Sequence, residues 1–155
     1  MSARAISAEG LYGPLRSQTR NLHTTIDPSG DPMVVNEEEK ALLEAGGGRV
    51  VLFLLSGPMI VGVAHAIARK HAAVEFHAQV VVMDLTEVSI LGTTVALALE
   101  NVIRDALHAG RRVVVAGAPE EARDVLGRLG VLSGNVELTD DRLTALRDAV
   151  SSLGD

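Results

Sequence analysis

Short, almost wholly apolar segments alternate along the chain with longer segments in which apolar residues recur every three or four positions. The short segments are typical of strands buried on both faces of a sheet, and the longer ones are typical of amphipathic helices. The pattern predicts strands at residues 49–55, 80–85, 112–116 and 136–138, and helices at residues 36–45, 58–73, 94–109, 119–129 and 139–153. The last strand is short, and we expect it at an edge of the sheet.

The alternation of strands and helices predicts parallel strands joined by right-handed crossovers. The expected fold is α/β, with a small, mostly parallel sheet of three to five strands covered by four or five helices. Asn36 and Glu39 have the spacing of a capping box, and Gly46 is a typical helix stop. Residues 1–35 show no sustained period and end in turn-forming residues, so we expect a flexible leader or linker there and one domain at 36–155.

Length and composition exclude several classes of protein. The 155 residues suffice for one domain that buries about 68–70% of its unfolded surface. The chain has no cysteine, which excludes disulfides and thiolate metal sites. The net charge is −6, the basic residues are scattered, and aromatic residues are few, so nucleic acid is not an expected partner. No apolar run reaches the roughly 18–20 residues that cross a bilayer, and no signal peptide is recognisable, so direct membrane insertion is not expected.

The usual motifs for catalysis and cofactor binding are missing from the sequence. It has neither a G-x-G-x-x-G fingerprint nor a Walker A motif, and Ser56 does not lie in a nucleophile elbow. The glycines at 46–48 precede a predicted strand instead of following one, which favours a connector over a phosphate-binding loop. We therefore expect no cofactor and no enzymatic activity.

The histidines and carboxylates give little support for a metal or acid–base site. His65, His71 and His77 recur every six residues, whereas two metal ligands on one helix face need a spacing of three or four. Surface positions are expected for them, with His71 a candidate for packing at a helix end. Asp84 and Glu87 are an alternative carboxylate pair, but an acid at the end of a strand more often accepts N–H groups of the next loop.

The carboxyl ends of the predicted strands gather the candidate functional residues, because ligands of open α/β sheets bind at that edge. Thr93 and Thr94 stand where a strand leads into the longest helix, whose first N–H groups and macrodipole favour a hydroxyl, a phosphate or an acidic partner. A simpler alternative is that one threonine caps the helix, which contributes about 1 kcal/mol. The candidate surface comprises Ser56, Gly57, Pro58, Thr86, Ser89, Gly92, Thr93 and Thr94.

Three stretches together resemble a known family. They are Leu55 to Ile67 (LSGPMIVGVAHAI), Asp84 to Thr94 (DLTEVSILGTT) and Ala98 to Asn101 (ALEN). They resemble the STAS domain, the sulfate-transporter and anti-sigma-factor-antagonist fold, in the form found in SulP-family anion transporters. Within that family, the amino-acid sequence of these stretches is similar to that of the bicarbonate transporters of cyanobacterial type. The resemblance covers roughly residues 49–150.

The resemblance implies a domain on the cytoplasmic face of the membrane that follows the transmembrane domain of an anion transporter. Such a domain supports homodimer assembly and regulates transport of bicarbonate or sulfate without transporting ions itself. In the related anti-sigma antagonists, a partner kinase phosphorylates a Ser or Thr in a loop like Asp-Ser-Ser-Gly, and Thr94 takes that position here. Gly92 and Val95 depart from the antagonist pattern, so recognition by a kinase of that type is not implied.

Two alternatives remain open from the sequence. The first is a free-standing phospho-switch like the anti-sigma antagonists, which fits the start at Met1 and the lack of a membrane segment. The second is a regulatory module that binds a nucleotide or an anion at low affinity near the strand ends, where helix N-termini favour negative charge.

Overall fold

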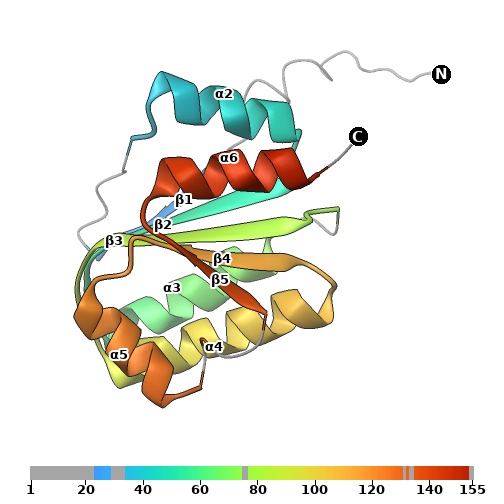
Figure 1. Ribbon diagram of the computed structural model, residues 1–155. Helices are drawn as coiled ribbons and strands as arrows, with labels where there is room; N and C mark the ends of the chain where they lie inside the picture. The colour runs from blue at the N-terminus through green and yellow to red at the C-terminus, as the bar shows by residue number, and fades with distance from the viewer. Residues whose placement is uncertain (1–22, 29–33, 75–76, 131, 133–134, 154–155) are drawn as a thin grey trace, which may run out of the picture.

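Five parallel strands form one sheet in the order β1-β2-β3-β4-β5, as the computed structural model in Figure 1 shows. The structure describes residues 23–28, 34–74, 77–130, 132 and 135–153. The strands are β1 (His23–Ile26), β2 (Val50–Met59), β3 (Val80–Leu91), β4 (Arg112–Ala116) and β5 (Val136–Thr139). The helices are α2 (Glu37–Gly46), α3 (Val61–Ala72), α4 (Thr93–His108), α5 (Glu120–Arg128) and α6 (Arg142–Ser152). The expected α/β architecture is confirmed.

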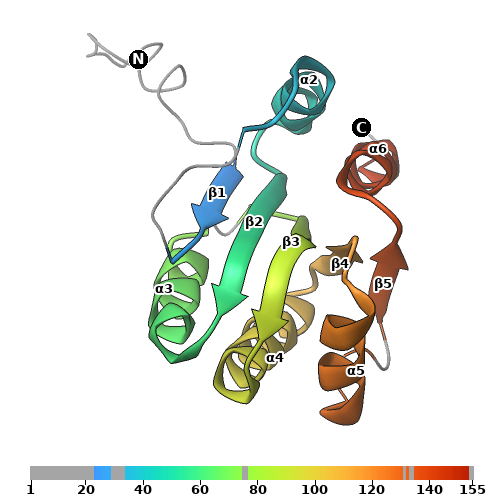
Figure 2. The same cartoon turned by 90° about the vertical axis from the view of Figure 1, so that its left-hand side faces the viewer.

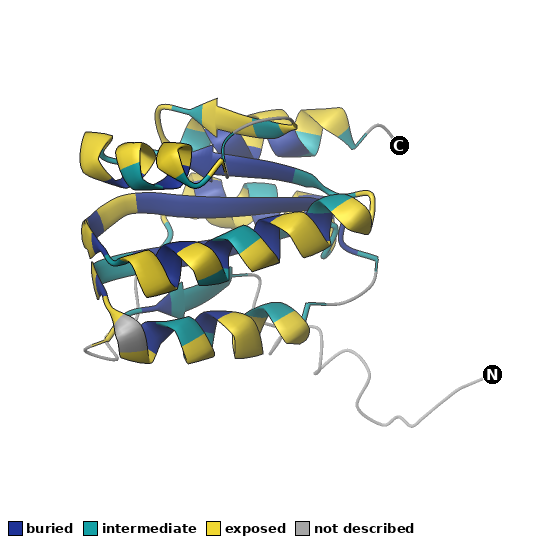
Figure 3. Cartoon of the chain, turned by 90° about the horizontal axis from the view of Figure 1, so that it is seen from below, coloured by how far each residue is buried: buried dark blue, intermediate teal, exposed yellow. Residues whose placement is uncertain are grey.

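The helices cover the sheet on both faces. α3, α4 and α5 pack on one face, and α2 and α6 pack on the other, as Figure 2 shows. Alternate residues of the strands point to opposite faces. Phe53 and Met83 therefore join the core beneath α3 and α4, whereas Leu54 and Val82 join the core beneath α2 and α6. The central strands are buried along most of their length in Figure 3, which explains their almost wholly apolar sequence.

The first crossover differs from the other three. α3, α4 and α5 lie on the same face and connect neighbouring strands in one direction, as right-handed crossovers. α2 connects β1 to β2 in the same direction over the opposite face, so that this crossover has the opposite hand. The chain consequently leaves the carboxyl ends of β1 and β2 toward opposite faces, which is the arrangement that leaves a crevice beside strand ends.

The expectation of a structureless leader at 1–35 is wrong for His23–Ile26. These residues form β1 and pair in parallel with Leu52–Leu55 of β2. The segment reads His-Thr-Thr-Ile, and only Ile26 is buried in the core. A strand of four residues with one buried side chain leaves no periodic signal, so the pattern could not reveal it. The rest of the expected leader lies mainly outside the described residues.

Two strands are longer than expected. β2 continues to Met59, so Pro58 lies in a strand and not in the first turn of a helix, and α3 begins only at Val61. β3 continues to Leu91, so residues 86–91 are not a loop. The β2–β3 ladder contains two register shifts, between Leu54 and Ser56 and between Gly57 and Pro58. Bulges of this kind accommodate a proline, and this part of the ladder lies beyond the partners of β1 and β4.

The expected capping box of the first helix is confirmed. The Asn36 side chain accepts the Glu39 N–H at 2.8 Å, and the Glu39 carboxylate accepts the Asn36 N–H at 2.9 Å. The helix ends one residue later than expected, because Gly47 and not Gly46 adopts the left-handed conformation, with φ of 61°.

Candidate functional site

The ends of β2 and β3 form a two-stranded extension of the sheet. Past the partners of β1 and β4, Ser56 pairs with Glu87, and Pro58 pairs with Ile90. The Gly92 N–H donates to the Met59 carbonyl at 2.8 Å and closes the end of this ladder. The extension thus places Ser56, Gly57 and Pro58 beside residues 87–90 of β3, and Gly92 beside Met59.

Glycine is favoured at two positions of the extension. Gly57 has φ of +84°, a conformation that other residues rarely adopt. A Cβ on Gly92 would lie 3.2 Å from the Met59 carbonyl oxygen, which is a tight contact. Gly92 therefore lets the end of β3 approach β2 closely before α4 begins.

The N-terminus of α4 is open to solvent. Gly92 is the N-cap residue, so the alternative that a threonine caps this helix is wrong. Thr93 and Thr94 occupy the first two helical positions, and both are exposed. No side chain among the described residues caps the helix, and its first turn carries no acid. The uncompensated N–H groups and the macrodipole favour negative charge at this end.

Exposed apolar side chains surround these threonines. The exposed fractions are 52% for Ile60, 59% for Ile90 and 43% for Leu97. Ile90 pairs with Pro58, Ile60 adjoins Gly92, and Leu97 lies one helical turn beyond Thr93. We refer to the resulting surface as the strand-end surface, which comprises Pro58, Ile60, Ile90, Thr93, Thr94 and Leu97. Contiguous exposed apolar groups with polar neighbours are characteristic of protein interaction sites.

Thr86 does not belong to this surface. Its N–H and its hydroxyl both donate to Asp84 Oδ1, at 3.0 and 2.6 Å. A Cβ on Gly117 would lie 2.0 Å from the Thr86 hydroxyl oxygen, and Gly117 also has φ of +64°. Thr86 therefore packs at the junction of β3 and β4, and Asp84 accepts a neighbouring N–H group as expected for a structural role.

Asp84 is also part of a buried charged network that the sequence did not predict. Arg142 donates from Nη1 to Asp84 Oδ2 and from Nε to Glu39 Oε2, both at 2.9 Å. Asp84 is 2% exposed and Glu39 is 4% exposed. Burial alone would lower the pKa of Arg142, but its hydrogen bonds and the negative charges of Glu39 and Asp84 raise that pKa above its ordinary value. The guanidinium thus joins α2, β3 and α6.

The only sequence signals for this network were weak. Glu39 was recognised as part of a capping box and Asp84 as a strand-end acid, but Arg142 lies 58 residues after Asp84 and 103 residues after Glu39. It follows Asp141, which caps α6 through a 2.7 Å contact with the Thr144 N–H. Local sequence therefore places Arg142 in a first helical turn without indicating which side chains it meets.

A hollow of about 430 Å³ lies beside the carboxyl end of β1 and one side of α3, from Gly62 to Lys70. Its wall is mostly apolar, with Thr25, Asp27 and Lys70 as the polar residues. This hollow is a candidate site for a small ligand, and its two charged residues, Asp27 and Lys70, have opposite signs.

Within the described residues, the histidines are not grouped with two or more other possible metal ligands. Across the described ranges, no group of three His, Cys, Asp or Glu side chains is arranged to hold a metal ion. His65 is exposed, whereas His71 packs at the end of α3, as the sequence allowed. None of the helices in the described part of the chain is both long and apolar enough to cross a bilayer.

Comparison with known proteins places this fold and these stretches in context. Residues 45–143 match the family model of the STAS domain. Over 132 residues, the chain is 45% identical to the bicarbonate transporter BicA of Synechocystis sp., covering 84% of this chain and 23% of that protein. It is also 45% identical over 105 residues to BicA of Picosynechococcus sp., covering 68% of this chain and 18% of that protein. The chain thus spans less than a quarter of the length of these curated relatives.

Two solved structures share the fold. The STAS domain of a SulP transporter from Vibrio cholerae superposes with a TM-score of 0.61 at 22% identity, covering 76% of this chain and 98% of that one. A sulfate transporter family protein from Wolinella succinogenes gives a TM-score of 0.61 at 19% identity, covering 79% of this chain and 93% of that one. At these identities the two structures support the arrangement of strands and helices alone.

Proposed function

Because this chain belongs to the STAS domain family, we propose that it acts as the non-enzymatic regulatory and assembly domain of a SulP-type anion transporter, at the cytoplasmic face of the membrane. The observation that carries the proposal is the strand-end surface, where an open helix N-terminus adjoins three exposed apolar side chains. The 45% identity to two bicarbonate transporters makes bicarbonate the first anion to test, with sulfate as the second.

The strand-end surface is suited to a protein partner. Ile60, Ile90 and Leu97 offer apolar contact area, and the first N–H groups of α4 offer hydrogen bonds to an acidic or carbonyl group. We propose the transmembrane domain of the transporter as the first partner. A second copy of the domain is the other partner we propose, in a homodimer.

Phosphorylation would change this surface directly. A phosphate on Thr94 would add a charge of about −1.5 to −2 beside a helix N-terminus that favours negative charge. Thr94 is exposed at the second helical position, so its hydroxyl is accessible to a kinase. Phosphate-affinity mass spectrometry of protein from its native cells tests the proposed phosphorylation. Failure to find Thr93 or Thr94 modified under any growth condition would contradict it.

The proposal is tested by charged substitutions on the strand-end surface. In cells that depend on the transporter containing or binding this chain, Ile90→Asp and Leu97→Asp should reduce anion uptake without unfolding the domain. Val34→Asp is the matched control, because Val34 is 81% exposed and precedes α2 on the other face of the sheet. Equal uptake by the surface variants and the control would contradict the proposed role of this surface.

The hollow beside β1 favours a second candidate function, low-affinity binding of an anion or a nucleotide. Lys70 supplies a positive charge there, and the N-terminus of α3 carries no acid and no side-chain cap among the described residues. Calorimetry with bicarbonate, sulfate and nucleotides tests this function. Binding heat that disappears in Lys70→Ala and remains in Lys40→Ala would support this function, because Lys40 is an exposed residue of α2. The absence of binding heat at millimolar ligand would exclude it.

A further inference from the structure

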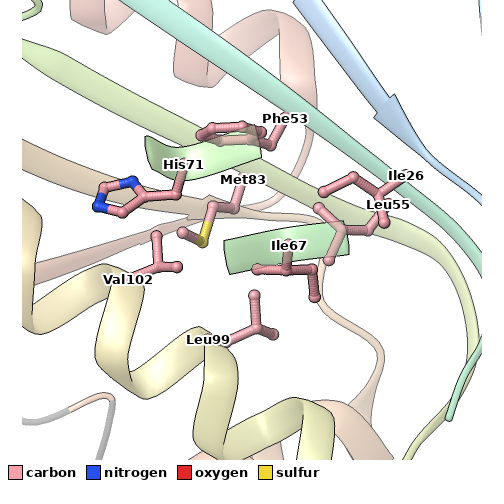
Figure 4. Close-up of a pocket in the computed structure, with 8 residues that line it drawn as sticks. All are labelled: Ile26, Phe53, Leu55, Ile67, His71, Met83, Leu99 and Val102. Atoms are coloured by element: carbon pink, nitrogen blue, oxygen red, sulfur yellow. The ribbon is translucent and has the colours of Figure 1, made fainter. Parts of the chain in front are cut away.

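His71 is the one polar side chain that lines an otherwise apolar cavity in the described core. It lies in the last turn of α3 and reaches between α3, α4 and the sheet. Its side chain is 13% exposed. Nδ1 is buried and makes no hydrogen bond with the described chain, while Nε2 lies 4.0 Å from Asp105 Oδ2 on α4. Figure 4 shows the ring beside Met83 and Val102.

The cavity cannot satisfy Nδ1. Besides His71, it is lined by Ile26, Phe53, Leu55, Ile67, Met83, Leu99 and Val102. Its volume of about 10 Å³ is at the lower limit for one water molecule, and a buried water needs two to four polar partners. A water in this cavity would have His71 alone. Nδ1 is therefore tolerated as an unpaired acceptor in the neutral ring but has no acceptor to receive a proton of its own.

Few charges face the ring. Asp105 approaches from α4 and Arg111 from the turn before β4, whereas β1, β2 and β3 present the apolar side chains of the cavity wall. Arg69 and Lys70, on the same helix as His71, are exposed. Burial lowers the pKa of His71, Asp105 raises it, and Arg111 lowers it again, so that the pKa lies below the ordinary value of 6.5.

We propose that His71 is a pH-sensitive contact that holds the end of α3 against α4 and the sheet while its ring is neutral and releases it on protonation. In the neutral state, the ring proton sits on Nε2 toward Asp105 and Nδ1 faces the cavity. A second proton on Nδ1 would be buried without an acceptor, and the imidazolium reaches water only if the last turn of α3 moves outward. The proton comes from solvent and returns to it when the ring packs again.

The direction of the effect follows from the lowered pKa. The neutral ring's contribution to stability is fully present above the unfolded pKa of about 6.5 and is lost as the pH falls through the folded pKa. The unfolded or opened state therefore gains protons first on acidification. α3 also forms part of the wall of the hollow beside β1 through Ala66 and Lys70, so opening its last turn would alter that hollow at low pH.

Hydrogen exchange on the purified chain tests the proposal. Amides of residues 67–74 should be well protected at about pH 8 and should lose protection about tenfold at about pH 5.5, after correction for the intrinsic exchange rate. Amides in β3 and α6 serve as internal references. His71→Phe and His71→Leu should abolish the extra loss in α3, while His65→Gln, an exposed histidine on the same helix, should keep it.

Asp105→Asn provides a second measurement. Removing this carboxylate should lower the pKa of His71 in the folded chain further, because Asp105 raises it. The loss of protection in α3 should still begin near the unfolded pKa of about 6.5, but it should continue to a lower pH and become larger in total. NMR titration of the His71 ring gives the pKa independently. Two results would overturn the proposal. One is an equal loss of α3 protection at low pH in wild type and in both His71 variants, and the other is an unchanged pKa of the His71 ring in the NMR titration of Asp105→Asn.

Discussion

The two faces of the sheet are held to their helices by different chemistry. On the α2–α6 face, the half-buried Arg142 bridges two buried carboxylates, and the Asn36 N–H donates to one of them from the helix cap. On the α3–α5 face, the core is apolar except for His71, whose inner nitrogen has no partner in the described structure. The first face depends on paired charges, so removing one of them should cause a large loss of unfolding free energy. On the second face, the unfolding free energy should vary with the volume of the buried side chains and with the protonation of His71.

The largest expected effect is on the charged face. Arg142→Met leaves Asp84 and Glu39 buried without their counter-charge, which should cost about 3–5 kcal/mol of unfolding free energy. Urea denaturation measures this cost. Arg147→Met is the control, because Arg147 and its partner Glu38 are 57% and 51% exposed and an exposed pair contributes about 0–1 kcal/mol. Equal losses of unfolding free energy in both variants would show that the buried network stabilises the fold no more than the exposed ion pair does.

On the apolar face, Leu99→Ala should cost about 2–5 kcal/mol, because Leu99 is 1% exposed and lines the cavity next to His71. The variant enlarges that cavity, and the unfolding free energy should fall without a change in the denaturant slope. Leu97→Ala on the same helix is 43% exposed and should change stability much less. Comparable losses at Leu97 and Leu99 would argue against the packing described for α4.

A smaller effect is expected from the cap that supports the charged face. Asn36→Ala removes one half of the capping box and should cost about 1 kcal/mol. The backbone N–H of residue 36 can donate to Glu39 in every variant, whereas the side-chain acceptor for the Glu39 N–H is lost in Asn36→Ala and retained in Asn36→Asp. Asn36→Asp should therefore recover most of the loss. Thermal unfolding of the three proteins measures the difference. No recovery in Asn36→Asp would indicate that the lost stability does not depend on a side-chain acceptor at the N-cap.

The smallest effect has the opposite sign. His71→Leu replaces an unpaired buried nitrogen with an apolar group and should leave stability at about pH 8 unchanged or raise it by up to about 1 kcal/mol. His65→Leu, at an exposed position of α3, is the control and should change little. A loss of several kcal/mol in His71→Leu would mean that the imidazole makes a contact essential to the neutral fold.

Several features of the fold and the candidate site were predictable because they depend on local pattern. The apolar runs at 80–85 and 112–116 report burial on both faces, and the capping box at Asn36 depends on residues three apart. The extension of β3 was not predictable, because Thr86, Glu87, Ser89 and Ile90 alternate with few buried residues once β4 has ended. Half-exposed strand sequences of this kind resemble loops, so residues 86–91 were assigned to a loop and not to the strand that they continue.

The sequence by itself determined the order of the strands and helices from β2 onward, and the stretches that carry the family. Both depend on neighbouring residues, whose spacing is fixed by the covalent chain. Only the tertiary structure decided that β1 joins the sheet, that Arg142 meets Asp84 and Glu39, and that the inner nitrogen of His71 faces an apolar cavity. These features depend on which surfaces meet after the chain folds, and residues far apart in sequence carry no local sign of that meeting.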